Sequence, residues 1–325
     1  MVERGPLVSV VVPAYEAGST IGATLSSLLW QTHRDLEVIV VDDGSTDATS
    51  AVVGAHDDPR IRLIRQDNAG PGAARNRGLE AARGDLFAFV DADDVLLPDY
   101  LAACLSVWHR AGGIVTSNAF WMFPGGIDPA LTRHRGPIPR PQDQRLTLLH
   151  QNWVSIMSVF PRKLVEDIGL LDEELERAED WDFWLRAIFA GHRVSLQRQP
   201  LALYRWGDAG LSADWREMDA DIEAIFTGLE QRVQLTEDER SYVQRRLGGP
   251  GPRVLGREGD AALRAGRYRH AARAYREAAR LCPAERPLVW KARVLSLFPP
   301  LVGPLVRARQ LRIEQEVGWE EDHQR

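Results

Sequence analysis

The sequence predicts an α/β fold in which a mostly parallel sheet is flanked by helices. Residues 7–12 and 36–41 are continuous runs of mostly β-branched residues, as in strands that are buried on both faces. A segment with apolar residues at helical spacing follows the first run, and strand and helix patterns then alternate to about residue 120. Strands that alternate with helices of this length build a parallel sheet covered on both sides.

Each predicted element has its own local signal. After a potential cap at Ser19 or Thr20, residues 21–29 place Ile21 and their leucines on one helical face. Shorter apolar runs predict strands at 61–64 and 86–90, and the Ala-rich segment 71–83 between them predicts a helix. Further segments predict helices from Pro98, near 163–167 and at 179–190. Strands are predicted from Ile114 and near 155–160. Residues 124–145 carry five prolines and little periodicity, which predicts a loop or lid.

Composition and charge exclude several classes of protein. The chain has 325 residues, with 44% hydrophobic and 26% charged residues, so it is expected to fold into more than one core. A net charge of −6 argues against a nucleic-acid partner. The two cysteines and the scattered histidines predict neither disulfides nor zinc. Because no signal peptide or spanning segment is apparent, a cytoplasmic location is expected.

The pattern changes near residue 212, which predicts two domains. Residues 1–212 form the α/β domain, and residues 213–325 are helical and rich in charge. A Gly-Pro cluster at 248–252 predicts a hinge, and residues 259–283 resemble one tetratricopeptide-like helix pair. Since a single such pair cannot bury its own faces, we expect a helical appendage rather than a repeat array.

Acidic residues follow three of the predicted strands, at Glu16, 42–43 and 91–94. Any one of these clusters could simply be a set of turn or capping acids. In a parallel sheet, however, the carboxyl ends of neighbouring strands share one edge, where ligands bind. Three acidic clusters there would repel one another without a cation, which indicates Mg²⁺ or Mn²⁺ completed by a nucleotide diphosphate.

Residues 7 to about 212 resemble the family 2 glycosyltransferases, which are inverting enzymes of the GT-A fold. Four motifs carry the resemblance in this order: VSVVVPAYEAGSTI, LEVIVVDDGSTDAT, NAGPGAARNRGLEAARGDLFAFVDADDVLLPDYL and GLLDEELERAEDWDFWLRAIFAGH. The resemblance implies a GT-A catalytic domain and a metal-dependent transferase. It says little about residues 213–325.

The resemblance also implies a binding site for a nucleotide-sugar donor. It assigns Pro13, Tyr15 and Glu16 to the nucleoside pocket and Asp43 to the N3–H of uracil or thymine. A carboxylate there discriminates against cytosine, which has no N3–H to donate. The remaining donor residues are Arg75 near the phosphates, Asp91 toward the ribose and Asp93 on the metal, with Asp91-Ala92-Asp93 as the DxD element.

The catalytic base is expected on the last motif. There the resemblance assigns the base to Asp180, while Glu179 and Trp181 face the acceptor. A positioned base of this kind contributes about 10²–10⁴-fold to the rate. Without the resemblance, Asp180 also fits a simple helix-capping acid. The sequence departs from the family at Gly207, where the family often has His, and this puts the composition of the metal shell in doubt.

The expected function is therefore transfer of a sugar from a UDP- or dTDP-sugar to a hydroxyl of a glycan or lipid-linked acceptor, in cell-surface polysaccharide synthesis. One alternative is a haloacid-dehalogenase-type phosphatase, since FAFVDADDV fits its signature with Asp91 as nucleophile and Lys163 as the only candidate for the catalytic lysine in this region. Another is a non-catalytic nucleotide-sugar-binding scaffold. A dehydrogenase fits poorly, because the segment 70–75 lacks a third glycine.

One segment of the helical region suggests a membrane partner. Residues 290–312 mix apolar residues with lysine and arginine. This composition allows peripheral contact with an anionic surface such as the inner face of the membrane. Packing of the tail on the rest of the protein is the alternative. The sequence leaves the donor sugar, the acceptor and the oligomeric state open.

Overall fold

The computed structural model describes residues 5–123, 125–134, 136–206, 215–283, 285–297 and 299–316. The chain divides into two compact units, one formed by Met1–Leu148 and Asn152–Ala213, the other by Leu149–Gln151 and Asp214–Arg325. The boundary expected near residue 212 and the departure at Gly207 lie outside the described residues.

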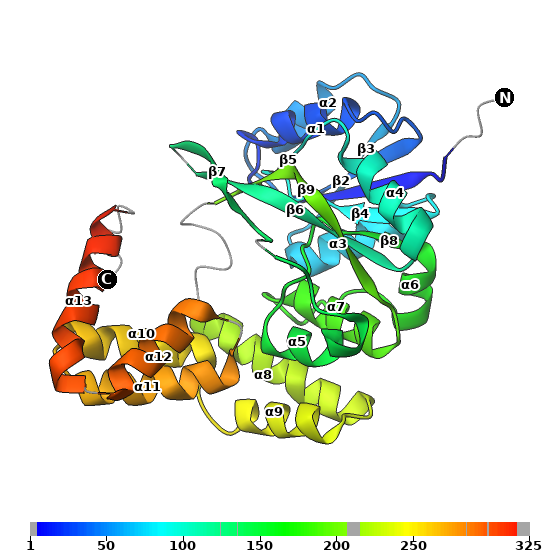
Figure 1. The fold of residues 1–325 in the computed structure, drawn as a ribbon. Helices are drawn as coiled ribbons and strands as arrows, with labels where there is room; N and C mark the ends of the chain where they lie inside the picture. Colours follow the sequence, from blue (N-terminus) through cyan, green and yellow to red (C-terminus); the bar gives the residue numbers. More distant parts are fainter. Residues whose placement is uncertain are drawn as a thin grey trace. The chain divides into compact units, whose positions relative to one another are not determined.

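The first unit is built on one nine-stranded sheet in the order β3-β2-β1-β4-β8-β6-β9-β5, with β7 paired to β6 (Figure 1). Its half from β3 to β4 is parallel throughout, as predicted, whereas β8, β7 and β5 run antiparallel to their neighbours. The strands are β1 (Val8–Ala14), β2 (Leu36–Asp43), β3 (Ile61–Gln66), β4 (Leu86–Phe89), β5 (Val95–Leu96), β6 (Ile114–Phe123), β7 (Gly126–Thr132), β8 (Val159–Pro161) and β9 (Val194–Arg205).

Helices cover both faces of this sheet, which explains why β2 and β4 are buried along their whole length. Helices α1 and α2 lie on the opposite face of the parallel half from α3 (Figure 1). The helices of this unit are α1 (Ile21–Leu29), α2 (Thr49–Gly54), α3 (Gly70–Ala81), α4 (Tyr100–Ala111), α5 (Gln144–His150), α6 (Arg162–Ile168) and α7 (Glu179–Phe189), with a 3₁₀ turn at Pro141–Asp143. The α/β prediction is confirmed.

The segment expected to be a loop or lid is partly a strand, so that prediction needs correction. β7 forms an antiparallel pair with β6, in which Met122 faces Ile127 and Phe120 faces Thr132. Pro129 lies within β7, where the edge position tolerates its missing N–H. The strand is mostly exposed, and therefore it lacks the alternation of apolar and polar residues that signals a half-buried strand.

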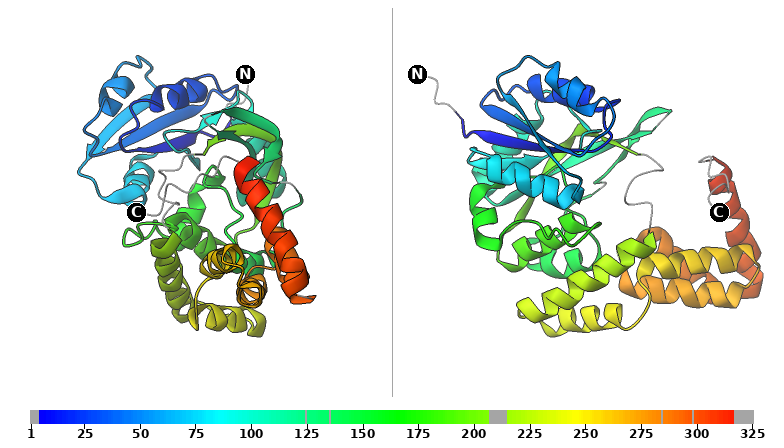
Figure 2. Two further views of the ribbon diagram at one scale, coloured as in Figure 1. Left: turned by 90° about the vertical axis from the view of Figure 1, so that its left-hand side faces the viewer. Right: turned by 180° about the vertical axis from the view of Figure 1, so that it is seen from behind.

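The second unit is helical, as expected. Its helices are α8 (Trp215–Arg232), α9 (Glu237–Leu247), α10 (Pro252–Arg264), α11 (Tyr268–Leu281), α12 (Arg286–Leu297) and α13 (Pro299–Glu316), shown from further sides in Figure 2. The predicted helix pair corresponds to α10 and α11, although α10 begins earlier, at Pro252. Asp260 joins three of these helices, because its Oδ1 accepts hydrogen bonds from Tyr275 (2.6 Å) and Lys291 (2.7 Å).

Candidate active site

The parallel pairing brings the ends of β1, β2 and β4 to one edge of the sheet. In register, Ala14 lies opposite Asp42, and Val11 lies opposite Phe89. The acidic residues 42–43 at the end of β2, Glu16 after β1 and the cluster 91–94 after β4 therefore lie at the same edge. This arrangement agrees with the expectation drawn from the sequence.

Asp43 is held rigidly at this edge. Its carboxylate accepts hydrogen bonds from Gln66 Nε2 (2.8 Å) and from the backbone N–H groups of Ala69 (3.0 Å) and Gly70 (2.9 Å). Asp43 thus caps the first turn of α3, where Gly70 adopts a positive φ of 90°. A carboxylate can accept about four hydrogen bonds, so room for roughly one more remains, on Oδ2.

The residues after β1 take different positions. Pro13 is half-buried within β1, and the Tyr15 ring is 55% exposed. Glu16 has a positive φ of 50°, and its Oε1 accepts hydrogen bonds from the Thr46 N–H (2.7 Å) and hydroxyl (2.9 Å). Glu16 therefore stabilises the turn after β2 through hydrogen bonds, whereas the exposed Tyr15 ring is accessible to a ligand.

Arg75 on α3 connects two parts of the site that are far apart in sequence. One guanidinium nitrogen donates to Asp91 Oδ1 (2.8 Å), and another donates to Glu179 at the start of α7. Arg75 is only 5% exposed. Burial disfavours its charge, but Asp91 and Glu179 outweigh burial and raise its pKa. Its Nε has no partner among the described residues.

The neighbouring Asn76 fastens the loop that leads into α7. Its Oδ1 accepts from the Leu171 N–H (2.9 Å), and its Nδ2 donates to the Leu171 carbonyl (3.0 Å) and to Glu173 (2.8 Å). Two adjacent residues of α3 thus position the segment that carries the predicted base.

The turn after β4 concentrates three carboxylates. Burial and the nearby Asp91 raise the pKa of Asp93. Asp94, which the sequence did not single out, is 1% exposed, and burial together with Asp91 and Asp93 raises its pKa well above the usual value. Its Oδ1 accepts from the Arg205 N–H (2.9 Å), while Oδ2 has no hydrogen-bond partner among the described residues.

These carboxylates fit a divalent cation, although the described residues form no cluster of three or more His, Cys, Asp or Glu side chains that could hold a metal by itself. The donors are hard oxygens, and a cation would relieve the mutual repulsion that raises the pKa of Asp93. Mg²⁺ and Mn²⁺ sites commonly use one or two carboxylates and take their other ligands from water and phosphate.

Asp180 lies at the start of α7, directly after Ala178 with its positive φ of 58° and the Arg75-bound Glu179. Asn152 Nδ2 donates to Asp180 Oδ2 (3.0 Å). Burial raises the pKa of Asp180, while the charges of Arg75 and Arg133 oppose this effect. A carboxylate with a raised pKa is a better proton acceptor.

The two residues expected on the acceptor side have other contacts. Glu179 is buried and paired with Arg75. The Trp181 indole N–H donates to the Leu148 carbonyl (2.8 Å), which ties α7 to α5. Both contacts position α7, and the Trp181 ring is half-buried. The motif alone could not predict these contacts, because the partner residues lie far from the motif in the sequence.

An aromatic and basic cluster lies close to the carboxylates. The ring centroids of Trp121 and Tyr204 are 5.2 Å apart, those of Trp121 and Trp206 5.5 Å, and the Arg133 guanidinium lies 5.4 Å from the Tyr204 centroid. Burial and the charge of Asp91 raise the pKa of Tyr204. Arg133 falls in the segment expected to be a loop, and only the pairing of β6 with β7 and β9 brings it here.

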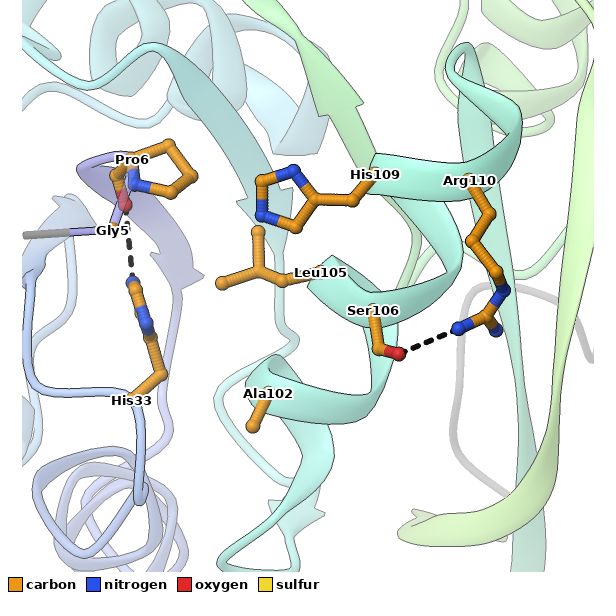
Figure 3. Close-up of a pocket in the computed structure, with 8 residues that line it drawn as sticks. All are labelled: Gly5, Pro6, His33, Ala102, Leu105, Ser106, His109 and Arg110. Atoms are coloured by element: carbon orange, nitrogen blue, oxygen red, sulfur yellow. Dashed lines mark hydrogen bonds between the residues drawn. The ribbon is translucent and has the colours of Figure 1, made fainter. Parts of the chain in front are cut away.

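A separate pocket of about 510 Å³ lies at the other end of the sheet. Figure 3 shows it between the residues that precede β1 and helix α4, with Pro6, His33 and His109 among its lining residues. Because these residues precede β1 and β2 or belong to α4, the pocket is remote from the carboxyl edge. It does not coincide with the acidic site.

Comparisons with known proteins agree with this geometry. Residues 9–169 match the family described as glycosyl transferase family 2. The succinoglycan biosynthesis protein ExoO of Rhizobium meliloti is 32% identical over 256 residues, covering 72% of this chain and 73% of that protein.

Two solved structures share the fold at 20% identity. One is S. aureus TarS 1–349 in complex with UDP-GlcNAc, with a TM-score of 0.58 over 89% of this chain and 90% of that one. The other is the mannosyltransferase PcManGT of Pyrobaculum calidifontis in complex with GDP-Man and Mn²⁺, with a TM-score of 0.56 over 98% and 88%. The GT-A fold expected from the resemblance is thereby confirmed, and the chain belongs to glycosyl transferase family 2.

Proposed function

We propose that this protein is a metal-dependent inverting glycosyltransferase that moves a sugar from a UDP- or dTDP-sugar to a hydroxyl of a glycan or lipid-linked acceptor. The observation that carries the proposal is the Arg75 bridge. Arg75 links Asp91 of the DxD turn to Glu179, which lies next to Asp180 and 104 positions after Arg75 in the sequence. A donor-binding turn and a base-bearing helix are thus held at one site.

The reaction needs a proton acceptor opposite the leaving group. In the proposed step Asp180 takes the proton of the acceptor hydroxyl while its oxygen attacks the anomeric carbon. The new carbon–oxygen bond forms as the bond to the diphosphate breaks, which inverts the configuration. Asn152 and the start of α7 hold the Asp180 carboxylate for this task.

Negative charge develops on the departing diphosphate. Asp93 would hold Mn²⁺ or Mg²⁺, and a bound cation supplies charge stabilisation there. Both terminal nitrogens of Arg75 are engaged by carboxylates. Arg75 therefore acts through the positions of Asp91 and Glu179 as well as through its charge.

Asp43 supports the assignment of the nucleotide. Its remaining acceptor capacity matches one N–H donor of a base, and the exposed Tyr15 ring offers a stacking face beside it. The UDP-GlcNAc complex of TarS supports a uridine donor, while the GDP-Man and Mn²⁺ complex of PcManGT supports a metal and makes guanosine the competitor to test.

The acceptor is proposed to be a glycan of a cell-surface polysaccharide, as the name of ExoO suggests. The rings of Trp121, Tyr204 and Trp206 offer faces on which a sugar can stack, and Arg133 adds a positive charge beside them. A cytoplasmic enzyme that meets a lipid-linked acceptor at the inner face of the membrane is part of the proposal. It requires a membrane-binding surface elsewhere in the chain.

The test is Asp180→Asn, which keeps the size of the side chain but cannot accept a proton at neutral pH. Transfer should fall by about 10²–10⁴-fold, while affinity for UDP with Mn²⁺ changes less than about threefold. Glu176→Gln, on the exposed part of the same loop, is the matched control and should keep full transfer. Near-normal transfer by Asp180→Asn would remove this residue from the mechanism. UDP binding without any transfer by the wild-type protein, across a panel of donors and acceptors, would favour the non-catalytic scaffold.

A further inference from the structure

The segment 286–313 has a charge opposite to that of the whole chain. It contains no Asp or Glu, whereas its basic residues are Arg286, Lys291, Arg293, Arg307, Arg309 and Arg312. The chain as a whole carries a net charge of −6. The positive charge of this segment is therefore a local property, and the general composition does not explain it.

The same segment exposes large apolar side chains on successive turns. Leu297 at the end of α12 and Leu301 and Leu305 on α13 are 72%, 73% and 71% exposed, and each is four residues from the next. Among the described residues these are the most exposed leucines. Scattered exposed leucines are ordinary, but Leu301 and Leu305 lie one turn apart and form a stripe on one face of α13, and Leu297 ends the helix before it.

The opposite side of α13 explains why this stripe points outward. Val306 is buried, and Gly303 packs so closely on the Tyr268 ring that an added Cβ would overlap it. Residues 303 and 306 therefore face α11, and 301 and 305 lie on the other side of the helix. Packing within the second unit fixes which face of α13 remains uncovered.

An arginine borders the stripe on one side. At 100° per residue, Arg309 lies about 60° from the line through Leu301 and Leu305 and is exposed, whereas Arg307 lies about 140° away, one turn after Gly303. The Arg309 guanidinium also lies 4.6 Å from the centroid of the partly exposed Trp290 ring on α12. Exposed leucines bordered by an arginine and an amphipathic indole are typical of helices that lie in a membrane interface.

We propose that this surface, formed by Leu297 of α12 with Leu301, Leu305 and Arg309 of α13 and called the leucine face below, binds an anionic lipid bilayer peripherally. None of the described helices is long and apolar enough to cross a membrane. The leucines enter the interface between headgroups and acyl chains, while Arg309 pairs with a lipid phosphate. The net positive charge of the segment 286–313 favours an anionic lipid surface over a neutral protein partner. The inference goes beyond the transfer reaction and is tested without donor or acceptor.

The test is co-sedimentation of the full chain with vesicles of phosphatidylglycerol and phosphatidylcholine, compared with vesicles of phosphatidylcholine alone. The wild-type protein should bind the anionic vesicles. Binding should weaken as the salt concentration is raised from about 0.05 to about 0.5 M, because this change shortens the Debye length about threefold and screens the charges. Leu301→Glu with Leu305→Glu should reduce the partition coefficient at least about tenfold. Arg309→Gln should reduce it about fivefold.

Leu170→Glu is the matched control, because Leu170 is an exposed leucine of the first unit, and it should leave the partition coefficient unchanged. Since the substituted leucines are exposed, the circular dichroism and melting temperature of the variants should match the wild type. Failure of the wild type to bind anionic vesicles, equal binding to both vesicle types, or unchanged binding by the double glutamate variant would each overturn the inference. So would light scattering that shows a dimer lost in that variant, because the leucine face would then join two copies of the chain.

Discussion

Removal of the Arg75 charge by Arg75→Gln tests whether the bridge between α3, the DxD turn and α7 holds the site together. Arg75 is nearly inaccessible and pairs with both Asp91 and Glu179. Loss of one partner of a buried pair costs about 3–5 kcal/mol, because the remaining charge is left buried and unpaired. The Asp91 side chain is 30% exposed and can be hydrated, so we expect most of this effect to come from Glu179.

The effect should depend on pH in a defined direction. Burial already raises the pKa of Glu179 while Arg75 lowers it, so loss of Arg75 raises the folded-state pKa further above the usual value of 4.5. A raised folded-state pKa means that the folded protein binds more protons than the unfolded chain above about pH 4.5. The stability of the variant therefore falls relative to wild type as the pH rises, and the loss is larger at about pH 8 than at about pH 5.

Hydrogen exchange of the α3 and α7 peptides measures this locally in the full chain. Arg77, which pairs with Glu80 on the exposed side of the same helix, provides the control, and Arg77→Gln should cost less than about 1 kcal/mol. Arg75→Gln combined with Glu179→Gln should recover more than half of the loss, because no buried charge remains unpaired. A loss below about 1 kcal/mol, an equal loss at both pH values, or no recovery in the double variant would refute the reasoning.

Three further predictions concern donor choice, packing and acid sensitivity. UDP or dTDP with Mn²⁺ should raise the melting temperature more than CDP does, and Asp43→Asn should abolish this difference. Equal shifts of the wild-type melting temperature for all three nucleotides would contradict the role of Asp43. Gly78→Ala should destabilise the protein by about 1–3 kcal/mol because an added Cβ overlaps the Val11 side chain, whereas Gly54→Ala, with open space around it, should be neutral or stabilising in urea unfolding. Burial, followed by the Arg133 charge, lowers the pKa of His134 from 6.5 to about 4, so the unfolded chain binds more protons in that range and stability should fall as the pH drops from 6.5 to 4. His134→Asn should flatten this part of the melting temperature profile, and an unchanged profile would contradict it.

The sequence by itself determined the parallel half of the sheet and the residues at its carboxyl edge. The strands β1, β2 and β4 are short, buried on both faces and followed by acids, so their patterns are local and readable. The same locality explains why the start of α7 was placed correctly at Glu179. The four motifs then indicated the family, which the comparisons confirmed.

Only the tertiary structure decided what the side chains at this edge contact. Arg75 was expected beside phosphates, yet its partners lie 16 and 104 positions away. Asp94 and Arg133 stand out only when β9 and β7 pair with their neighbours. The physical reason is that the partner of a buried charge depends on which segments pack together, whereas a strand or a helix start depends on residues within a few positions.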